Sequence, residues 1–426
     1  MMPKPRNRHG HITAGLRIAL WAGYVLRPFA IALLRRRLTR GKEDPQRWKE
    51  KLGDCHAPRP DGSLVWLHGV GLGEVLALRA LVAGLSAVQP DLRFLITYST
   101  RSAGVVISRN LPRGCQHQFL PLDLPGIVDR FLDHWRPDLA VWTDQEIWPR
   151  LSYLLNHRGI PQAIVACRIS QISFESRRRF QSFYRGLYSL PELIEAQDEV
   201  TARSILQFSG RVVPVTGSLK PAVDVLSAAA DHEGISDALR DRDVWLLSSS
   251  HPADEEIAIS AHSRLILSRP EELLIIAPRD PSRGAEIAVK ARALGLTVCQ
   301  RDELPSCGVK VWVADSIGEL GSWYRIARAA LIGGTFDATE GHNPWEAVAL
   351  GAAIFFGPCT ANFATDFARL SRAGAALQIG SADDLVDALL SSDLDGMSEV
   401  AYMERSIAAE AVKGIAGRLV ALMKTK

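Results

Sequence analysis

Short apolar runs alternate with stretches of helical periodicity along most of the chain. In the first half the apolar runs predict strands at 64–68, 94–99, 139–143, 163–167 and 193–197, with a further run at 212–217. The stretches between them predict helices at 74–86, 101–110, 125–135 and 199–208. Strands separated by helices in this way are typical of a parallel sheet with crossover helices.

A second series of the same kind begins near Asp243. Its apolar runs predict strands at 244–250, 273–279, 309–315, 329–336, 353–357 and 375–380. Helices are predicted between them at 253–268, 282–294, 344–350 and 381–391. The stretch 218–243 lacks a strand pattern and contains Pro221 and Gly234, so we expect the boundary between two domains there.

These patterns predict an α/β fold with two Rossmann-like, doubly wound domains, in keeping with a length of 426 residues. We expect an N-terminal segment at 1–52, a first domain at 53–222, a linker at 223–242 and a second domain at 243–426. The last helix of the second domain could pack against the first domain. Open α/β sheets bind ligands beyond the carboxyl ends of their strands, so two facing domains would form a cleft. GT-B glycosyltransferases and nucleotide-sugar 2-epimerases share this layout, and the fold alone does not choose between them.

The N-terminal segment carries most of the positive charge. The net charge is +3, but residues up to Leu52 carry +10 and the remainder carries −7. The apolar run 15–34 is almost long enough to span a bilayer, although Arg17, Arg27 and Pro28 interrupt it. We therefore predict a helix in the interface of an anionic membrane rather than a nucleic-acid partner, with a transmembrane span and a soluble packed helix as alternatives. A removed secretory signal is not expected, because no small-residue cleavage site follows the run.

The six cysteines give no sign of a metal site. They stand at positions 55, 115, 167, 299, 307 and 359, without CxxC or Cys/His ligand spacing. We therefore expect no bound metal, no disulfide framework and a reducing compartment. Nothing else in the sequence indicates a cofactor.

The motif HGVGLGEV (68–75) joins a predicted strand to a predicted helix. Its glycines permit a tight turn and close approach by a ligand. Glu74 opens the helix, where a carboxylate can take a proton from an acceptor hydroxyl. The same position also suits a glutamate that only stabilises the helix start, because a helix N-terminus favours the ionised form.

Two further motifs in the first half carry candidate charges. Asp144 and Glu146 follow the strand 139–143 and would point the same way if the strand continued. Glu146 equally suits a buried partner of an arginine such as Arg168. Lys220 lies near the domain boundary, where a cation would balance charge on a leaving phosphate or simply be an exposed linker residue.

Polar residues follow successive predicted strands of the second half. They are Ser250 and His251 in SSSHP (248–252), Arg279 in APRDP (277–281), Ser316 and Gly318 in DSIGEL (315–320), and Asn343, Pro344 and Glu346 in GHNPWEA (341–347). Arginine suits a phosphate, a helix N-terminus suits an anion, and a carboxylate suits ribose hydroxyls. Asn343 is also a natural N-cap, with Pro344 at the first helical position and Glu346 as a capping-box partner. Four such features at successive strand ends predict a nucleotide site.

Together these motifs resemble the Kdo transferase family, where Kdo is 3-deoxy-D-manno-oct-2-ulosonic acid, and the resemblance covers almost the whole chain. It rests on GKEDPQRWKEKLG (41–53), FLPLDLP (119–125), TDQEIWP (143–149), ACRIS (166–170), GSLK (217–220), SSSHP, PRD (278–280), IGEL (317–320), GGTF (333–336), GHNPWE and GPCTANF (357–363). The resemblance implies a GT-B fold on the cytoplasmic face of the inner membrane, without metal or cofactor. It implies transfer of Kdo from CMP-Kdo to a hydroxyl of the tetraacyl disaccharide bisphosphate precursor of lipid A, with inversion.

The resemblance also implies roles for individual residues. Glu74 would be the general base, and Asp144 and Lys220 would stabilise the transition state. The CMP site would comprise Pro278, Arg279, Ile317, Gly318, Glu319, Asn343, Pro344, Trp345 and Glu346.

The chain departs from the usual family pattern at five positions. They are Gly71 for serine, Asp144 for glutamate, Ala166 for asparagine, Asp280 for histidine and Ala347 for proline. Asp144 keeps the charge but shortens its reach, and Asp280 would partly neutralise the neighbouring Arg279. Two alternatives therefore stay open: a divergent transferase with another acyl-sugar acceptor or ulosonic acid, and a non-catalytic membrane-bound protein that binds a CMP-sugar or lipid.

Overall fold

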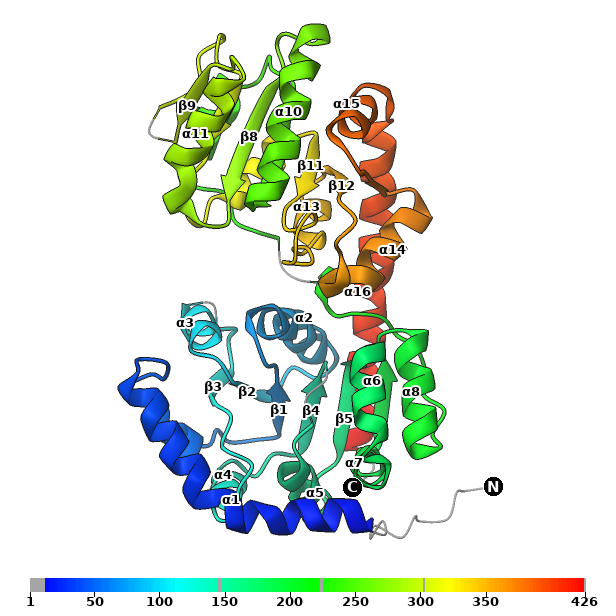
Figure 1. Cartoon of the computed structure of the whole chain (residues 1–426). Helices are drawn as coiled ribbons and strands as arrows, with labels where there is room; N and C mark the ends of the chain where they lie inside the picture. Colours follow the sequence, from blue (N-terminus) through cyan, green and yellow to red (C-terminus); the bar gives the residue numbers. More distant parts are fainter. Residues whose placement is uncertain (1–11, 110, 145–146, 223–224, 302, 425–426) are drawn as a thin grey trace. The chain divides into compact units, whose positions relative to one another are not determined.

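The computed structural model describes residues 12–109, 111–144, 147–222, 225–301 and 303–424. Contacts between Cα atoms divide the chain into two compact units: unit 1 comprises residues 1–223 and 408–426, and unit 2 comprises residues 224–407. Each unit is built on its own parallel sheet (Figure 1). Residues from 408 onward, which the sequence assigned to the second domain with the option of packing back on the first, belong to unit 1.

The sheet of unit 1 has six parallel strands in the order β3-β2-β1-β4-β5-β6. The strands are β1 (Leu64–His68), β2 (Arg93–Tyr98), β3 (Cys115–Phe119), β4 (Leu139–Thr143), β5 (Gln162–Cys167) and β6 (Leu193–Ala196). Every residue of β1, β4 and β5 is buried, because helices cover both faces of a doubly wound parallel sheet. The strand order reverses between β1 and β4, which makes this pair the topological switch point of unit 1.

The helical elements of unit 1 cover the two faces of this sheet. They are α1 (Ala14–Thr39), η1 (Trp48–Leu52), α2 (Leu72–Val88), α3 (Arg101–Arg109), α4 (Ile127–Trp135), α5 (Pro149–His157), α6 (Gln171–Arg178), α7 (Gln181–Ser189), α8 (Glu199–Ser209) and η2 (Lys220–Ala222). One core lies under α2 and α3, and the opposite core lies under α4, α5, α7 and α8.

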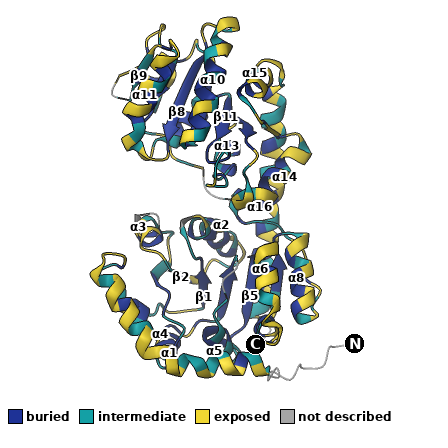
Figure 2. Cartoon of the chain, in the orientation of Figure 1, coloured by how far each residue is buried: buried dark blue, intermediate teal, exposed yellow. Residues whose placement is uncertain are grey.

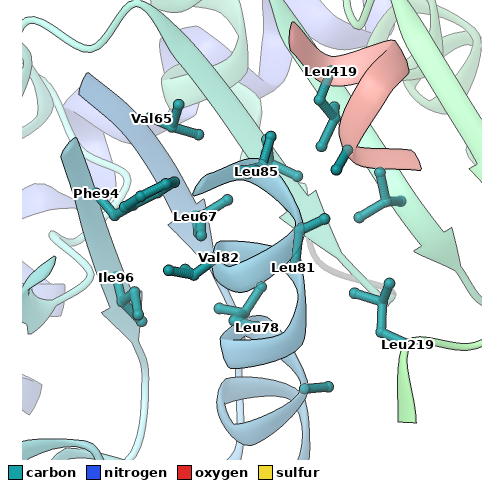
Figure 3. Close-up of a cluster of buried hydrophobic side chains, with 14 of the residues drawn as sticks. Val65, Leu67, Leu78, Leu81, Val82, Leu85, Phe94, Ile96, Leu219 and Leu419 are labelled. Atoms are coloured by element: carbon teal, nitrogen blue, oxygen red, sulfur yellow. The ribbon is translucent and has the colours of Figure 1, made fainter. Parts of the chain in front are cut away.

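The C-terminal helix α16 (Leu394–Met423) completes the first of these cores. Its residues Ile415 and Leu419 are buried in the same cluster as Leu81 and Leu85 of α2 (Figure 3). A Cβ atom added at Gly84 of α2 would lie 3.3 Å from Ala416, so the two helices approach closely there. The end of the chain is therefore part of the hydrophobic core of unit 1.

Unit 2 contains a seven-stranded parallel sheet in the order β13-β12-β11-β7-β8-β10-β9. The strands are β7 (Val244–Ser250), β8 (Leu273–Pro278), β9 (Val298–Gln300), β10 (Val311–Val313), β11 (Ala329–Ile332), β12 (Ala353–Phe356) and β13 (Ala376–Gln378). The order reverses between β7 and β11, which is the switch point of this unit. Two clusters of buried apolar residues pack on the two faces of the sheet.

The remaining helices flank the second sheet. They are α9 (His232–Ala238), α10 (Pro252–Ser268), η3 (Pro281–Arg283), α11 (Gly284–Ala293), α12 (Leu320–Ile326), α13 (Trp345–Val348), η4 (Ala361–Phe363), α14 (Ala364–Ala373) and α15 (Ala382–Ser391). The two doubly wound sheets confirm the predicted α/β fold of GT-B type.

The set of predicted strands differs from the structure at three places, and no bounds were predicted for the helices α5, α6, α7, α12, α14 and α16. The run 212–217 forms only an isolated bridge, between Val215 and Ala196, and not a strand. Two edge strands, β3 and β9, were not predicted. The sequence of β3, CQHQF, is mostly polar because it lies at the edge of the sheet and is only partly covered.

Helix α1 lies against α5 and α7, and much of its surface is exposed (Figure 2). Leu16 and Leu34 are buried, whereas Ile18, Trp21 and Phe29 have more than 60% of their surface exposed, at 68%, 68% and 69%. Among the described residues, α1 is the helix long and apolar enough to cross a bilayer, although core helices and signal sequences share that property.

Candidate functional site

In unit 1, Glu74 and Asp144 follow the two strands that form the switch point. β1 ends at His68 and leads through a short glycine-rich turn to Glu74 in the first turn of α2. β4 ends at Thr143, directly before Asp144. Since β1 and β4 are neighbours in a parallel sheet, both carboxylates come from the same edge of the sheet. Open α/β sheets bind their ligands at this edge.

The Glu74 carboxylate closes the N-terminus of α2. Its Oε2 accepts a hydrogen bond of 3.0 Å from the backbone N–H of Gly71, and the residue is half-buried. A Cβ atom at Gly69 would lie 3.1 Å from the nitrogen of Val75, so the turn needs glycine there. Glu74 therefore makes the contact expected of a glutamate that only stabilises the start of α2. It also lies at the edge of the sheet where a general base would have to lie.

Asp144 has a left-handed backbone conformation, with φ of 58°. Its carbonyl oxygen accepts from the backbone N–H of Arg168 at 3.3 Å, which links the ends of β4 and β5. On β5, Ala166 also has a positive φ, of 48°, beside a register shift in the pairing with β6. The proposed partner of Asp144, Glu146, lies outside the described residues.

Lys220 begins the short helix η2, which packs against α2. Its backbone N–H donates to Ser218 Oγ at 3.1 Å, and the preceding Leu219 is buried in the core under α2. Lys220 is thus fixed to the helix that carries Glu74, rather than lying in a free linker.

In unit 2, the predicted nucleotide-binding residues follow four neighbouring strands. Ser250 is the last residue of β7 and Pro278 the last of β8, and His251 and Arg279 come directly after them; Ile317 to Glu319 follow β10, and Asn343 to Glu346 follow β11. The strands lie side by side in the order β11-β7-β8-β10, so these residues share the carboxyl edge of the sheet. This is the arrangement that the spacing of the motifs predicts.

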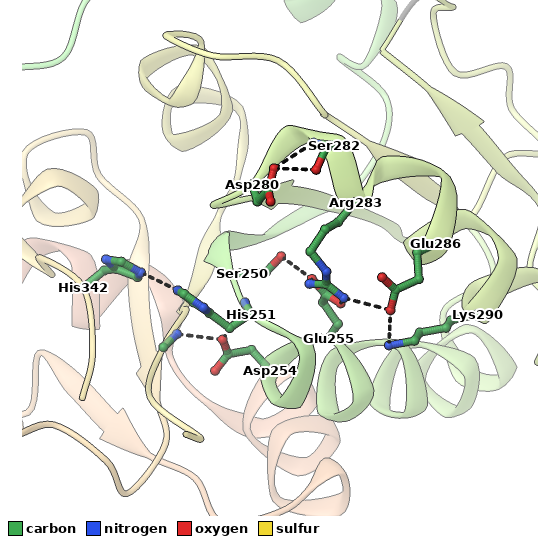
Figure 4. Close-up of polar contacts among 11 residues, drawn as sticks. Ser250, His251, Asp254, Glu255, Asp280, Ser282, Arg283, Glu286, Lys290 and His342 are labelled. Carbon is green, nitrogen blue, oxygen red and sulfur yellow. Dashed lines mark hydrogen bonds and ion pairs between the residues drawn. The ribbon is translucent and has the colours of Figure 1, made fainter. Parts of the chain in front are cut away.

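Two histidines meet at the switch point of unit 2. The Nε2 atoms of His251 and His342 are 3.0 Å apart, and the two rings are stacked with centroids 5.2 Å apart (Figure 4). Burial lowers the pKa of His342 to about 4, and electrostatic interactions with His251 and Arg279 act in the same direction. His342 lies within the GHNPWE motif but was not predicted as a site residue.

Asp254 holds this region together and was also not predicted. Its buried carboxylate accepts from the backbone N–H of His251 at 2.9 Å and of Gly334 at 2.6 Å. It also accepts from Thr335 and Phe336, both at 3.2 Å. Burial raises the pKa of Asp254, although these N–H donors act in the opposite direction. One carboxylate therefore fastens the start of α10 to the loop after β11.

The side chains after β7 and β8 are partly committed to internal contacts. Ser250 Oγ donates to Glu255 Oε1 at 3.0 Å, and Arg283 pairs with the same carboxylate at 2.5 and 2.9 Å. Arg279 is exposed, and its backbone N–H donates to Ser250 O. The Asp280 carboxylate, which the sequence placed beside Arg279, is held by Ser282. Its Oδ1 accepts from both the N–H and the hydroxyl of Ser282, which caps η3.

The loop after β10 is anchored by a salt bridge. The Glu319 carboxylate accepts from Arg301 Nε at 2.7 Å and Nη2 at 3.0 Å, and the Ser316 hydroxyl also donates to it. Gly318 has a positive φ of 91°, and Ile317 is 86% exposed. Glu319, and not Ser316 or Gly318, is the N-cap of α12, so the predicted helix start lies slightly too early.

The GHNPWE motif begins α13 one residue later than predicted. The N-cap is Pro344, and Asn343 Oδ1 accepts from the backbone N–H of Trp345 at 3.1 Å. Trp345 is buried, and its indole N–H donates to Asp366 at 2.8 Å, so it supports the motif from the core. Glu346 accepts from Asn343 Nδ2 at 3.4 Å. Burial raises the pKa of Glu346, while Asn343 and the charge of Arg279 lower it.

The carboxyl edge of the sheet carries acidic side chains in unit 1 and groups that can bind an anion in unit 2. Unit 1 offers carboxylates that can accept a proton, and unit 2 offers an exposed guanidinium, imidazoles and loop N–H groups that suit a nucleotide. In the described part of the chain, no three His, Cys, Asp or Glu side chains are grouped to hold a metal ion.

A solved structure with the same architecture is UDP-GlcNAc 2-epimerase from Neisseria meningitidis bound to UDP-GlcNAc. It aligns with a TM-score of 0.58 and 14% identity, covering 84% of this chain and 99% of that chain. At this identity the likeness shows the fold alone. Two doubly wound parallel sheets, each with a topological switch point, are the architecture of the GT-B fold.

Sequence comparisons give the family. The sequence model of the 3-deoxy-D-manno-octulosonic-acid transferase (kdotransferase) family matches residues 46–223. A probable mitochondrial 3-deoxy-D-manno-octulosonic acid transferase of Arabidopsis thaliana is 35% identical, covering 78% of this chain and 77% of that protein. A 3-deoxy-D-manno-octulosonic acid transferase of Haemophilus influenzae is 30% identical, covering 80% of this chain and 82% of that protein. The chain therefore belongs to the Kdo transferase family of glycosyltransferases.

Proposed function

We propose that this protein transfers Kdo from CMP-Kdo to a hydroxyl of the acylated disaccharide phosphate precursor of lipid A, with inversion and without a metal. The observation that carries the proposal is the position of Glu74, at the switch-point edge of unit 1 next to the strand that leads to Asp144. Family membership supports the donor and the transferred sugar.

Glu74 acts as the general base in this proposal. Its carboxylate takes the proton of the acceptor hydroxyl, and that oxygen attacks the anomeric carbon of Kdo. The bond between that carbon and the CMP phosphate oxygen breaks, and CMP leaves with the electron pair. Asp144 and Lys220 stabilise the transition state around the reacting atoms. The hydrogen bond from Gly71 to one carboxylate oxygen fixes the direction of the other.

Unit 2 binds the donor in this proposal. Arg279, exposed beyond β8, faces the CMP phosphate with the backbone N–H groups around Gly318. Glu346 and Asn343 accept from and donate to the ribose hydroxyls. Ser250, His251 and Pro278 line the same edge, and Trp345 holds the motif in place from the core. The Arg279 guanidinium supplies the positive charge that departing CMP requires.

The N-terminal helix keeps the enzyme at its acceptor. The exposed apolar face of α1 enters the cytoplasmic side of the inner membrane, and the run from Arg35 to Arg37 binds anionic headgroups. The acyl chains of the acceptor remain near the bilayer while its sugar reaches Glu74.

The proposal is tested by Glu74→Gln, which keeps an oxygen for the Gly71 N–H but removes the base. We expect the rate of Kdo transfer to fall by about 10²- to 10⁴-fold. The matched control is Glu199→Gln, an exposed glutamate in the first turn of α8. The assay supplies freshly generated CMP-Kdo and the lipid precursor with EDTA present, and mass spectrometry measures the lipid product.

Wild-type turnover by Glu74→Gln would remove Glu74 from the base role. Absence of any product with the wild-type protein, together with CMP binding by calorimetry, would favour the non-catalytic binding protein. Product formed only with a different acyl-sugar or ulosonic acid would favour the divergent transferase.

A further inference from the structure

An apolar groove runs between α1 and α7 in unit 1, and we call it the α1–α7 groove. It has a volume of about 580 Å³, within the range of roughly 300–1,000 Å³ of small-ligand pockets. Its apolar lining comes from Ile18 and Ala19 on α1 and from Phe180, Phe183 and Tyr184 around α7. Ile18 and Phe180 are 68% and 64% exposed, so the groove is open to the surroundings.

The α1–α7 groove shares part of its lining with a second hollow. That hollow, of about 240 Å³, shares Phe183 and Tyr184 with the groove and is also lined by residues 147–149. These residues begin α5 and follow β4, the strand that ends directly before Asp144. Phe183 and Tyr184 thus line both the groove beside α1 and the hollow at the start of α5.

Positive charge lies at the rim of the groove. Arg178 and Arg179 end α6, are exposed and line a third hollow with Glu175. Within the described ranges, neither guanidinium has a hydrogen bond or an ion pair. The neighbouring Arg177 differs, because its guanidinium donates to Tyr188 OH at 2.9 Å and lies over the Tyr184 ring.

We propose that the α1–α7 groove binds one acyl chain of the acceptor while Arg178 and Arg179 bind an acceptor phosphate. This inference rests on the proposed function and names how its acceptor is held. An apolar channel with unpaired arginines at its rim fits a molecule that is both acylated and phosphorylated. Without the groove, an acyl chain of the acceptor would enter water when the sugar leaves the bilayer surface. Each methylene group of that acyl chain that stays buried changes the affinity by roughly fourfold.

The first test fills the groove with Ala19→Trp. We expect the ratio of kcat/KM for the fully acylated acceptor to that for a de-O-acylated acceptor to fall about tenfold or more. The matched control is Ala32→Trp, an exposed alanine further along α1 that does not line the groove. A wild-type ratio in Ala19→Trp would overturn the inference.

The second test does not depend on turnover, so it separates this inference from the proposed function. An acceptor analogue with a photoreactive diazirine in one acyl chain is crosslinked to the full-length protein in vesicles. We expect labelling of the segments 15–19 and 180–184, which excess unlabelled acceptor suppresses and excess phosphatidylglycerol does not. Labelling elsewhere, or equal suppression by phosphatidylglycerol, would overturn the assignment to the acceptor.

The same labelling experiment tests the arginines. We expect the double variant Arg178→Ala/Arg179→Ala to lower labelling by the acceptor analogue at least fivefold. Arg203→Ala, which removes an exposed arginine from α8, is the control and retains wild-type labelling. Equal labelling by the double variant would overturn the assignment of the phosphate to this rim.

Discussion

The buried carboxylate of Asp254 is the most consequential single contact of the candidate donor site. It accepts from four backbone N–H groups, of which three belong to the loop 334–336 and one to His251. The perturbation is Asp254→Asn, which keeps the size and shape of the side chain. An amide has one accepting oxygen, and its NH₂ group would face two of the N–H donors.

The magnitude follows from the number of donors left without an acceptor. Each buried N–H that loses its acceptor costs about 1–3 kcal/mol, so two of them cost about 4 kcal/mol. That cost appears as local opening, because the loop 334–336 can leave the start of α10 while the sheet stays intact. We expect the dissociation constant for CMP to rise at least tenfold, because His251 and His342 lose their common support.

Amide hydrogen exchange measures the local opening, and calorimetry measures CMP binding. In Asp254→Asn we expect faster exchange of the amides of residues 334–336, with unchanged exchange in β1 and β4 of unit 1. The control is Asp384→Asn, which removes an exposed carboxylate that accepts from Gly380 at the start of α15. Wild-type exchange and CMP affinity in Asp254→Asn would refute the reasoning.

Two further predictions concern stability. Burial lowers the pKa of His262 to about 4, and its Nδ1 accepts from the Trp245 indole at 3.1 Å. As the pH falls, His262 is protonated in the unfolded chain before it is protonated in the folded one, so the free energy of unfolding of unit 2 should fall by about 3 kcal/mol between pH 6.5 and pH 4. In urea unfolding, His262→Asn should show a flatter dependence of this free energy on pH. The same dependence in the variant and the wild type would contradict the prediction. Ala166→Gly should stabilise unit 1 by about 0.5–1 kcal/mol by relieving its left-handed backbone, whereas Ala163→Gly on the same strand should destabilise it, and thermal unfolding distinguishes the two signs.

The fold was largely predictable because a strand that is buried on both faces of the sheet consists of an unbroken run of apolar residues. β1, β4 and β7 have the predicted bounds. β3 escaped prediction because its polar side chains find specific partners: Gln118 accepts from the Trp135 indole, and His117 contacts Tyr98 OH. The run 212–217 contains Pro214, which has no N–H to donate to a strand ladder.

The site was predictable in its location but not in its contacts. The motifs predicted that Glu74, His251 and Arg279 lie at the carboxyl edges of the two sheets, where the structure places them; their roles stay predictions. Contacts between distant segments leave no local pattern: Asp254 looks like an ordinary first-turn carboxylate, yet its other partners lie some 80 residues later. Only the capping position of Asp254 in the motif SSSHPAD offered a signal.

The shared helix α16 sets the order in which this protein can mature. The core beneath α2 lacks Ile415, Leu419 and their neighbours until the C-terminal half of α16 has been synthesised. At about 5–20 residues per second, the ribosome needs roughly 10–40 s to pass from the end of the first part of unit 1 to the C-terminus. During that interval the nascent α2 has an uncovered apolar surface, so a gene fragment ending near residue 223 would yield an aggregation-prone product, whereas supplying residues 408–423 of α16 as a separate peptide should rescue its solubility.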